Sequence, residues 1–203
     1  MLRAKHLLIS AFSVLALSTL AAPKAHAEFI VDVYQSGSNV VFDGSGSLNI
    51  VGLTADFTSG SNDQIVPEFA VLSFGSQTID ENFYYTVNGP TSFGSGSISY
   101  ATTVSGDTVT LTNTGYEEIG VPDGYVSGAA LSSEMIFDDS TIASLGLDDG
   151  TYTWTWGTDT TADSFVINVG TDPATVPEPS SIASFAAGLI GLGFFIYRRR
   201  KMV

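Results

Sequence analysis

Apolar and polar residues alternate in short runs through residues 28–170. A period of two is typical of β-strands, because successive side chains on a strand point to opposite faces. Val, Ile, Phe, Tyr and Thr fill the runs, while Gly, Asn, Asp and Ser separate them, as expected for strands joined by turns. The pattern predicts ten strands, at residues 29–34, 40–43, 47–53, 69–74, 82–87, 97–103, 108–112, 135–138, 152–156 and 164–169.

The segments between these runs predict turns. Ser105-Gly106-Asp107 lies between two runs and predicts a hairpin, and residues 88–90 combine Gly with Pro, which cannot donate to a strand ladder. Residues 141–145 predict a single helical turn. Short strands with regular turns and no internal boundary predict one all-β domain over 28–170, a β-sandwich or a jelly-roll-like fold.

The N-terminal residues 1–27 predict a secretory signal peptide. Arg3 and Lys5 precede an apolar stretch at 7–22, and Ala25-His26-Ala27 has the small residues that signal peptidase requires. We expect the secretion machinery to export the chain and signal peptidase to cut between Ala27 and Glu28. The alternative is an uncleaved N-terminal anchor, and both interpretations place the domain outside the cytoplasm.

The C-terminus predicts a second membrane segment. Residues 171–176 form a polar linker, and residues 180–197 are uncharged and long enough for about 27 Å of helix, close to the thickness of a hydrocarbon core. Arg198, Arg199, Arg200 and Lys201 follow immediately. Basic residues favour the cytoplasmic side, so this tail is expected to stay inside while the domain remains outside.

Charge separates the domain from the two terminal segments. Of the 21 acidic residues, all but Glu178 lie in 28–177, and this stretch contains no Lys and no Arg, so its formal charge is about −20. Salt bridges between side chains are therefore impossible within it. Nucleic-acid binding is not expected, because phosphate contacts depend on Lys and Arg. The repulsion should favour solubility at some cost in stability.

The same composition restricts the chemistry. The protein has no Cys, and both histidines lie in the signal peptide, so the domain has no Ser-His-Asp triad, no Cys-His pair and no His- or Cys-ligated zinc. Adjacent acids recur, but neighbours on a strand point to opposite faces and do not flank one glycosidic bond. We expect no enzymatic activity and no cofactor; a calcium site built from carboxylates is an alternative to general cation screening.

Three large aromatic residues alternate in the run at 152–156. Tyr152, Trp154 and Trp156 share one face of the predicted strand, with threonines between them. Such a face most simply fills the core of a sandwich. The alternative is a platform that stacks against sugar rings, which would make the domain a carbohydrate-binding module.

The chain ends in a pattern with three parts: Pro177-Glu178-Pro179, an apolar helix and the basic cluster that includes Arg198, Arg199 and Arg200. This pattern, at residues 177–203, resembles the PEP-CTERM sorting signal. The resemblance implies recognition by an exosortase, a membrane protease, in a bacterium that has an outer membrane and produces exopolysaccharide. It implies brief anchoring in the inner membrane, followed by transfer to the cell surface or release. The alternative is an ordinary single-pass anchor.

The domain itself resembles one group of PEP-CTERM proteins. The similarity lies in the segments "VYQSGSNVVFDGSGSLNIVGL", "GPTSFGSG", "VPDGYVSGAALS" and "SLGLDDGTYTWTWGTDTTADSFVINVG". It implies export and a shared fold rather than a mechanism. The sequence is thus interpreted as an acidic structural or adhesive component of the cell surface or extracellular matrix, with exopolysaccharide as a further expected partner and carbohydrate binding as the alternative function.

Overall fold

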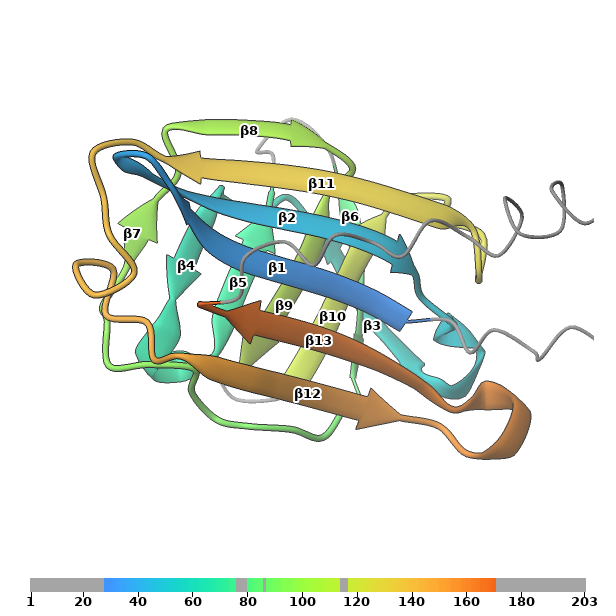
Figure 1. Ribbon diagram of the computed structural model, residues 1–203. Helices are drawn as coiled ribbons and strands as arrows, with labels where there is room; N and C mark the ends of the chain where they lie inside the picture. The colour runs from blue at the N-terminus through green and yellow to red at the C-terminus, as the bar shows by residue number, and fades with distance from the viewer. Residues whose placement is uncertain (1–27, 76–79, 86, 114–116, 171–203) are drawn as a thin grey trace, which may run out of the picture.

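The computed structural model describes residues 28–75, 80–85, 87–113 and 117–170. The predicted signal peptide, linker and sorting signal with its membrane helix lie outside these residues. The described part forms thirteen strands in two sheets and contains three short 3₁₀ turns but no α-helix. The two sheets pack as a sandwich (Figure 1), which confirms the predicted fold class.

The six-stranded sheet has the order β12-β13-β1-β2-β11-β8. Its first and last strands along the chain, β1 and β13, are parallel neighbours, so Glu28 pairs with Ser164 and Val33 with Val169. The remaining pairs in this sheet are antiparallel. The bounds are β1 Glu28–Ser36, β2 Asn39–Ser47, β8 Thr103–Gly106, β11 Ala130–Phe137, β12 Gly150–Trp156 and β13 Asp163–Val169.

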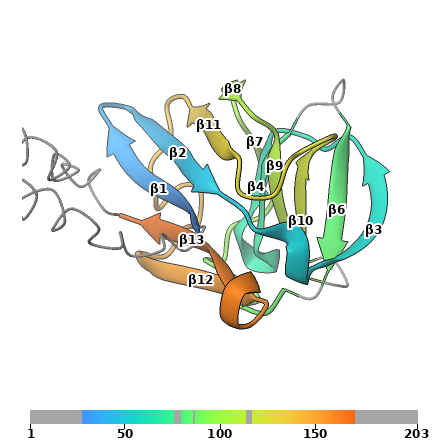
Figure 2. The ribbon, with the colours of Figure 1, turned by 90° about the vertical axis from the view of Figure 1, so that its right-hand side faces the viewer.

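The seven-stranded sheet has the order β3-β6-β10-β9-β5-β4-β7 and is antiparallel throughout. In Figure 2 it lies beside the first sheet, on the right of the view, with β3 outermost beyond β6. The bounds are β3 Thr54–Ser59, β4 Gln64–Val66, β5 Val71–Phe74, β6 Glu81–Tyr85, β7 Ser99–Tyr100, β9 Val109–Asn113 and β10 Glu117–Pro122, with 3₁₀ turns at η1 Ile50–Gly52, η2 Pro67–Phe69 and η3 Asp159–Thr161.

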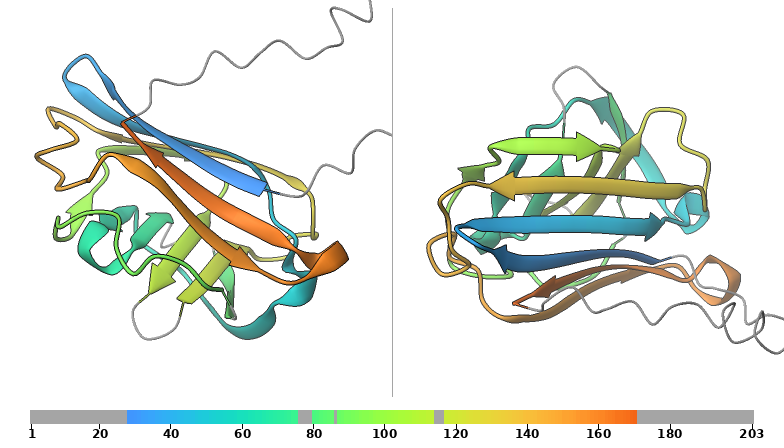
Figure 3. Two further views of the ribbon diagram at one scale, coloured as in Figure 1. Left: turned by 60° about the horizontal axis from the view of Figure 1, so that its bottom comes forward. Right: turned by 45° about the horizontal axis from the view of Figure 1, so that its top comes forward.

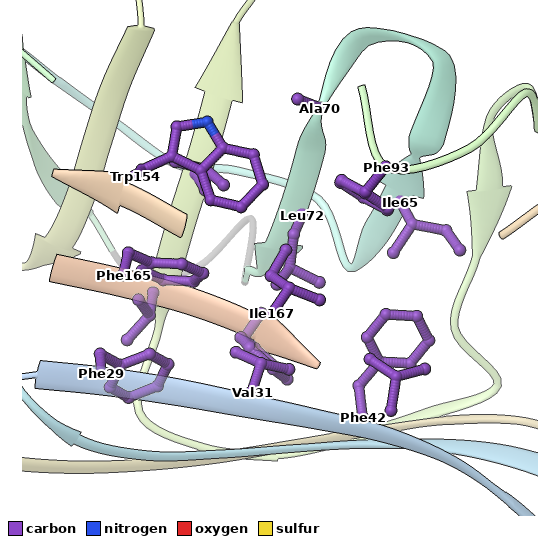
Figure 4. Packing of buried hydrophobic residues seen from close by; sticks show 14 of the residues in the cluster. Phe29, Val31, Phe42, Ile65, Ala70, Leu72, Phe93, Trp154, Phe165 and Ile167 are labelled. Carbon is purple, nitrogen blue, oxygen red and sulfur yellow. The ribbon is translucent and has the colours of Figure 1, made fainter. Parts of the chain in front are cut away.

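The core lies between the facing sides of the two sheets. Strand β1 is a clear example of the alternation: Phe29, Val31 and Val33 are fully buried, while the residues between them are half-buried. Large side chains from β12, β13 and β2 meet residues of β4 and β5 across the interior (Figure 4). The further views in Figure 3 show the strands of the two sheets crossing at an angle, so each sheet covers the apolar face of the other.

Two local predictions were wrong. Residues 47–53 do not form a strand: β2 ends at Ser47, and Asn49 accepts a hydrogen bond from the N–H of Val51 at 3.1 Å, which starts the 3₁₀ turn η1. The predicted hairpin at Ser105-Gly106-Asp107 does not form, because the strands on either side of it, β8 and β9, belong to different sheets. Asp107 instead binds β11, accepting from the N–H of Ser132 at 2.9 Å, and the chain then crosses to the other layer.

The boundaries elsewhere differ by a few residues. Ala70 has a left-handed conformation (φ 50°) after η2, so β5 begins later than the expected start at residue 69. The expected run at 97–103 divides into β7 and the start of β8. Residues 141–145 form one turn, closed by a bond from the N–H of Leu145 to the carbonyl of Thr141 at 3.0 Å. Four strands were not predicted: β3, β4, β10 and β8, of which the expected run at 97–103 reaches only the first residue.

Candidate functional site

The sorting residues proposed from the sequence lie outside the described part of the chain. This applies to Pro177-Glu178-Pro179, to the basic cluster 198–200, to the membrane helix 180–197 and to Ala27. Glu28, on the other side of the predicted cleavage point, is the first residue of β1. Within the described ranges, no helix has the length and apolar character needed to span a membrane.

The aromatic strand β12 faces the interior. Trp154 is 0 % exposed and Trp156 4 %, and Tyr152 packs against the same core. Each indole N–H has a partner: Trp154 donates to the carbonyl of Pro90 at 3.0 Å, and Trp156 to the carbonyl of Asn49 at 2.8 Å. A buried ring cannot stack against a sugar, so the structure corrects the stacking alternative for these two tryptophans and supports the core interpretation.

Two exposed aromatic rings, Phe57 of β3 and Tyr85 of β6, lie instead on the outer face of the seven-stranded sheet. Strand β3 has one extra residue against β6, because the pairs Ala55–Tyr84 and Thr58–Asn82 are three residues apart on β3 and two on β6. Such a bulge re-aims side chains. Here the extra residue lets Phe57 stack on Phe83 of β6, with ring centroids 4.8 Å apart and planes 11° from parallel.

The bulge also directs a carboxyl group across β6. Asp56 of β3 shares a hydrogen bond with Glu118 of β10, and Glu118 is 8 % exposed. Burial, then the hydrogen bond and then the negative charge of Asp56 raise the pKa of Glu118. Two carboxyl groups in direct contact are closer than the separation of about 5 Å or more that glycosidases need between theirs.

Glu81 is a second unusual acid, at the start of β6. It is 0 % exposed, and no cationic side chain exists in the domain to pair with it. Its carboxylate accepts from the hydroxyl of Ser61 and from that of Thr110 at 3.0 and 3.2 Å, and the Ser73 hydroxyl lies 2.9 Å from Ser61 and 2.7 Å from Thr110. Burial raises the pKa of Glu81 to about 7, although the hydroxyl bonds oppose this shift.

Two of the adjacent acid pairs differ in exposure. On β10, Glu118 is buried while its neighbour Glu117 is half-buried; Glu81, the first residue of β6, is buried while Asp80, which precedes that strand, is exposed. Within the residues that the structure describes, no group of three or more potential ligands is arranged to hold a metal ion.

A row of three acids crosses the outer face of the six-stranded sheet, which we call the acidic row. Asp43 of β2 pairs directly with Asp32 of β1 on one side and with Glu134 of β11 on the other. Burial, followed by the charges of these three acids, raises the pKa of the nearby Tyr34. Like charges on directly opposed residues destabilise a sheet, so this row is a local source of the repulsion expected from the composition.

We therefore expect Asp43→Asn to raise the free energy of unfolding by a few tenths of a kcal/mol at low salt, because it removes two cross-strand repulsions. The gain should shrink as sodium chloride rises, since salt screens exposed charges. Thermal melting of the wild type and the variant across a salt series measures this. Glu68→Gln, at an exposed acid on η2, is the control. A gain that is independent of salt, or equal in the control, would contradict the prediction.

Sequence reasoning missed Asp56 and Phe57 because their strand, β3, was not recognised. The segment 54–59 reads T-A-D-F-T-S, with a lone Phe57 among small and polar residues, and all of it is exposed. A bulge also breaks the period of two that identifies strands. The available signal was Phe57 itself, a large apolar residue in an otherwise polar run.

One comparison with known proteins gives a match. Residues 175–201 match the model of the PEP-CTERM protein-sorting motif, so the resemblance of the C-terminus is confirmed. The motif implies an exported chain that is processed by an exosortase, and proteins with this motif are sorted to the cell surface. No curated protein and no solved structure matches the chain.

Proposed function

We propose that this chain, an exported exosortase substrate by its PEP-CTERM motif, serves as a structural or adhesive component of the cell surface or extracellular matrix. The observation that carries the proposal is one β-sandwich joined to a sorting motif at the C-terminal end of the chain. Its acidic surface keeps the protein soluble during export, and its aromatic core gives a stable module without disulfides.

The chemistry of the domain supports a non-enzymatic role. Carboxylates, tyrosines and hydroxyls are the reactive groups available between residues 28 and 177. The carboxyl pair Asp56–Glu118 is in direct contact, and Glu81 is enclosed by hydroxyl groups away from solvent. The Asp56–Glu118 pair leaves no room between its carboxyl groups for a glycosidic bond or a water molecule, and the buried Glu81 is closed to a substrate.

The sorting role of the tail gives a direct test in cells. Proline resists helix at the preceding residue, so Pro177-Glu178-Pro179 should keep the approach to the membrane extended, as a protease site requires. We expect Glu178→Ala to leave membrane insertion unchanged and to block conversion of the precursor to the shorter surface form. Immunoblots of fractionated cells, with and without the exosortase, measure this conversion.

Asp172→Asn is the matched control, because it neutralises an acid upstream of the matched motif. It should mature normally. Equal processing in both strains, or normal maturation of Glu178→Ala, would mean that the tail is only an anchor. The matrix role is tested separately: a strain lacking this protein should lose cell-to-cell cohesion or matrix mass, and unchanged values of both would refute the role.

A further inference from the structure

The Phe57 ring has one covered face and one open face. Its stacking on Phe83 covers one side, while 47 % of Phe57 remains exposed; Phe83, beneath it, is 5 % exposed. Within the described residues, β3 is the edge strand of its sheet, so no neighbouring strand covers the side of Phe57 that faces away from β6. Because the ring is held in place by its stacking on Phe83, its open side offers a fixed flat surface against which an apolar group can pack.

Neighbouring groups extend this plane into a platform. Tyr85 lies two residues beyond Phe83 on β6, hence on the same face, and is 39 % exposed. Glu118 of β10 is the direct cross-strand partner of Tyr85, and its carboxyl group shares a hydrogen bond with that of Asp56. The platform, defined here as Asp56, Phe57, Phe83, Tyr85 and Glu118, therefore presents two exposed rings, Phe57 and Tyr85, and the exposed carboxyl group of Asp56, above the buried Phe83 and Glu118.

The negative charge of the domain restricts the ligands that the platform can bind. Carboxylates accept hydrogen bonds, so a complementary ligand must offer donors such as hydroxyl groups. Anionic polysaccharides, nucleic acids and anionic lipid surfaces are repelled, because the domain carries no positive side chain against many acids. A neutral sugar chain offers an apolar C–H face for the rings and hydroxyl donors at its edges.

We propose that this platform binds a neutral polysaccharide, with Phe57 as the stacking ring, Tyr85 as its flank and the Asp56–Glu118 pair as the hydrogen-bonding edge. The proposal rests on the adhesive function proposed above and names the ligand class that adhesion would use. It places sugar contact on β3, β6 and β10, at the opposite layer from the buried tryptophans of β12 (Figure 2).

Native affinity electrophoresis tests the proposal with mature protein recovered from exporting cells. The gels contain one neutral polysaccharide each: hydroxyethylcellulose, laminarin, xylan or galactomannan; an alginate gel is the anionic arm. We expect one or more neutral gels, and not alginate, to retard the wild type. Phe57→Leu, which still covers Phe83 but has no aromatic plane, should weaken binding by about tenfold or more. Phe57→Tyr should retain it.

Tyr100→Ala is the distant control, because Tyr100 is 62 % exposed on β7 at the far edge of the same sheet. It should bind like the wild type. Absence of retardation in every neutral gel, equal retardation of Phe57→Leu, or loss of binding in Tyr100→Ala would overturn the proposal. Binding that 0.5 M sodium chloride abolishes would also overturn it, since it would indicate an ionic partner. Cell cohesion distinguishes failure of this proposal from failure of the matrix role. If cells that express Phe57→Leu cohere normally while cells lacking the protein do not, the matrix role stands and the platform is not its binding site.

Discussion

Replacing Trp154 by alanine is expected to lower the free energy of unfolding by about 3–5 kcal/mol, the usual cost of removing a large aromatic ring from a core. The indole is fully buried and meets Phe93 and Phe165 edge-on, at centroid distances of 6.5 and 6.3 Å. Gly89 packs so closely on it that an added Cβ would lie 2.2 Å from the ring. The cavity could not close without moving this loop.

Thermal or urea unfolding of the exported protein measures this loss. Trp154→Phe should fall between the wild type and the alanine variant, because it keeps ring packing but loses the hydrogen bond to Pro90. Thr153→Ala is the control on the exposed side of β12 and should change stability by no more than about 0.5 kcal/mol. A loss below 1 kcal/mol for Trp154→Ala would contradict a core role for this ring.

The second large effect concerns pH. The pKa of Glu81 is raised from 4.5 to about 7 by burial, so the folded protein holds a proton that the unfolded chain releases in this interval. Stability from this group is therefore complete below about pH 4.5 and is lost as the pH rises through 7. We expect Glu81→Gln to be more stable than the wild type at pH 8, by up to about 3 kcal/mol, and nearly equal at pH 5.

The measurement is the difference in unfolding free energy between variant and wild type at several pH values. Taking the difference cancels the loss of stability that comes from repulsion among the other acids, because this repulsion grows with pH in both proteins. Asp80→Asn neutralises the exposed neighbour and serves as the control, with a small difference at every pH. Parallel curves for Glu81→Gln and the wild type from pH 5 to pH 8 would show that Glu81 does not titrate in this interval.

The prediction of the fold succeeded where neighbouring residues carry the information. Burial alternates along β1 and β12 because one face of each is buried, and β13 contains a run of β-forming apolar residues at 165–167. All three strands were found with small errors at the ends. Strands β3 and β10 were missed for opposite reasons. All of β3 is exposed, and most of β10 is buried on both faces, so neither shows the alternation.

The prediction of the sorting motif succeeded at the C-terminus, whereas no candidate site within the domain was found from the sequence. The PEP-CTERM motif is recognisable because its three parts are contiguous, and it needs no fold to be read. The tryptophans of β12 were correctly placed on one face, but the sequence left open which side of the sheet that face meets. The platform around Phe57 depends on a β-bulge, and a bulge can be recognised only when the pairing of its two strands, β3 and β6, is known.

The amino-acid sequence alone determined the C-terminal sorting motif, the all-β class and the absence of any positive charge within 28–177. The absence of positive charge already requires that a buried acid be neutral or be bonded to uncharged donors, such as the hydroxyl groups around Glu81. Only the tertiary structure decided which acid is buried, which ring is exposed and which strands share a sheet. Ser61, Ser73 and Thr110 reach Glu81 from separate segments, and β8 leaves β9 because Asp107 binds β11. Contacts between distant segments form only when the whole chain packs, so no local pattern carries them.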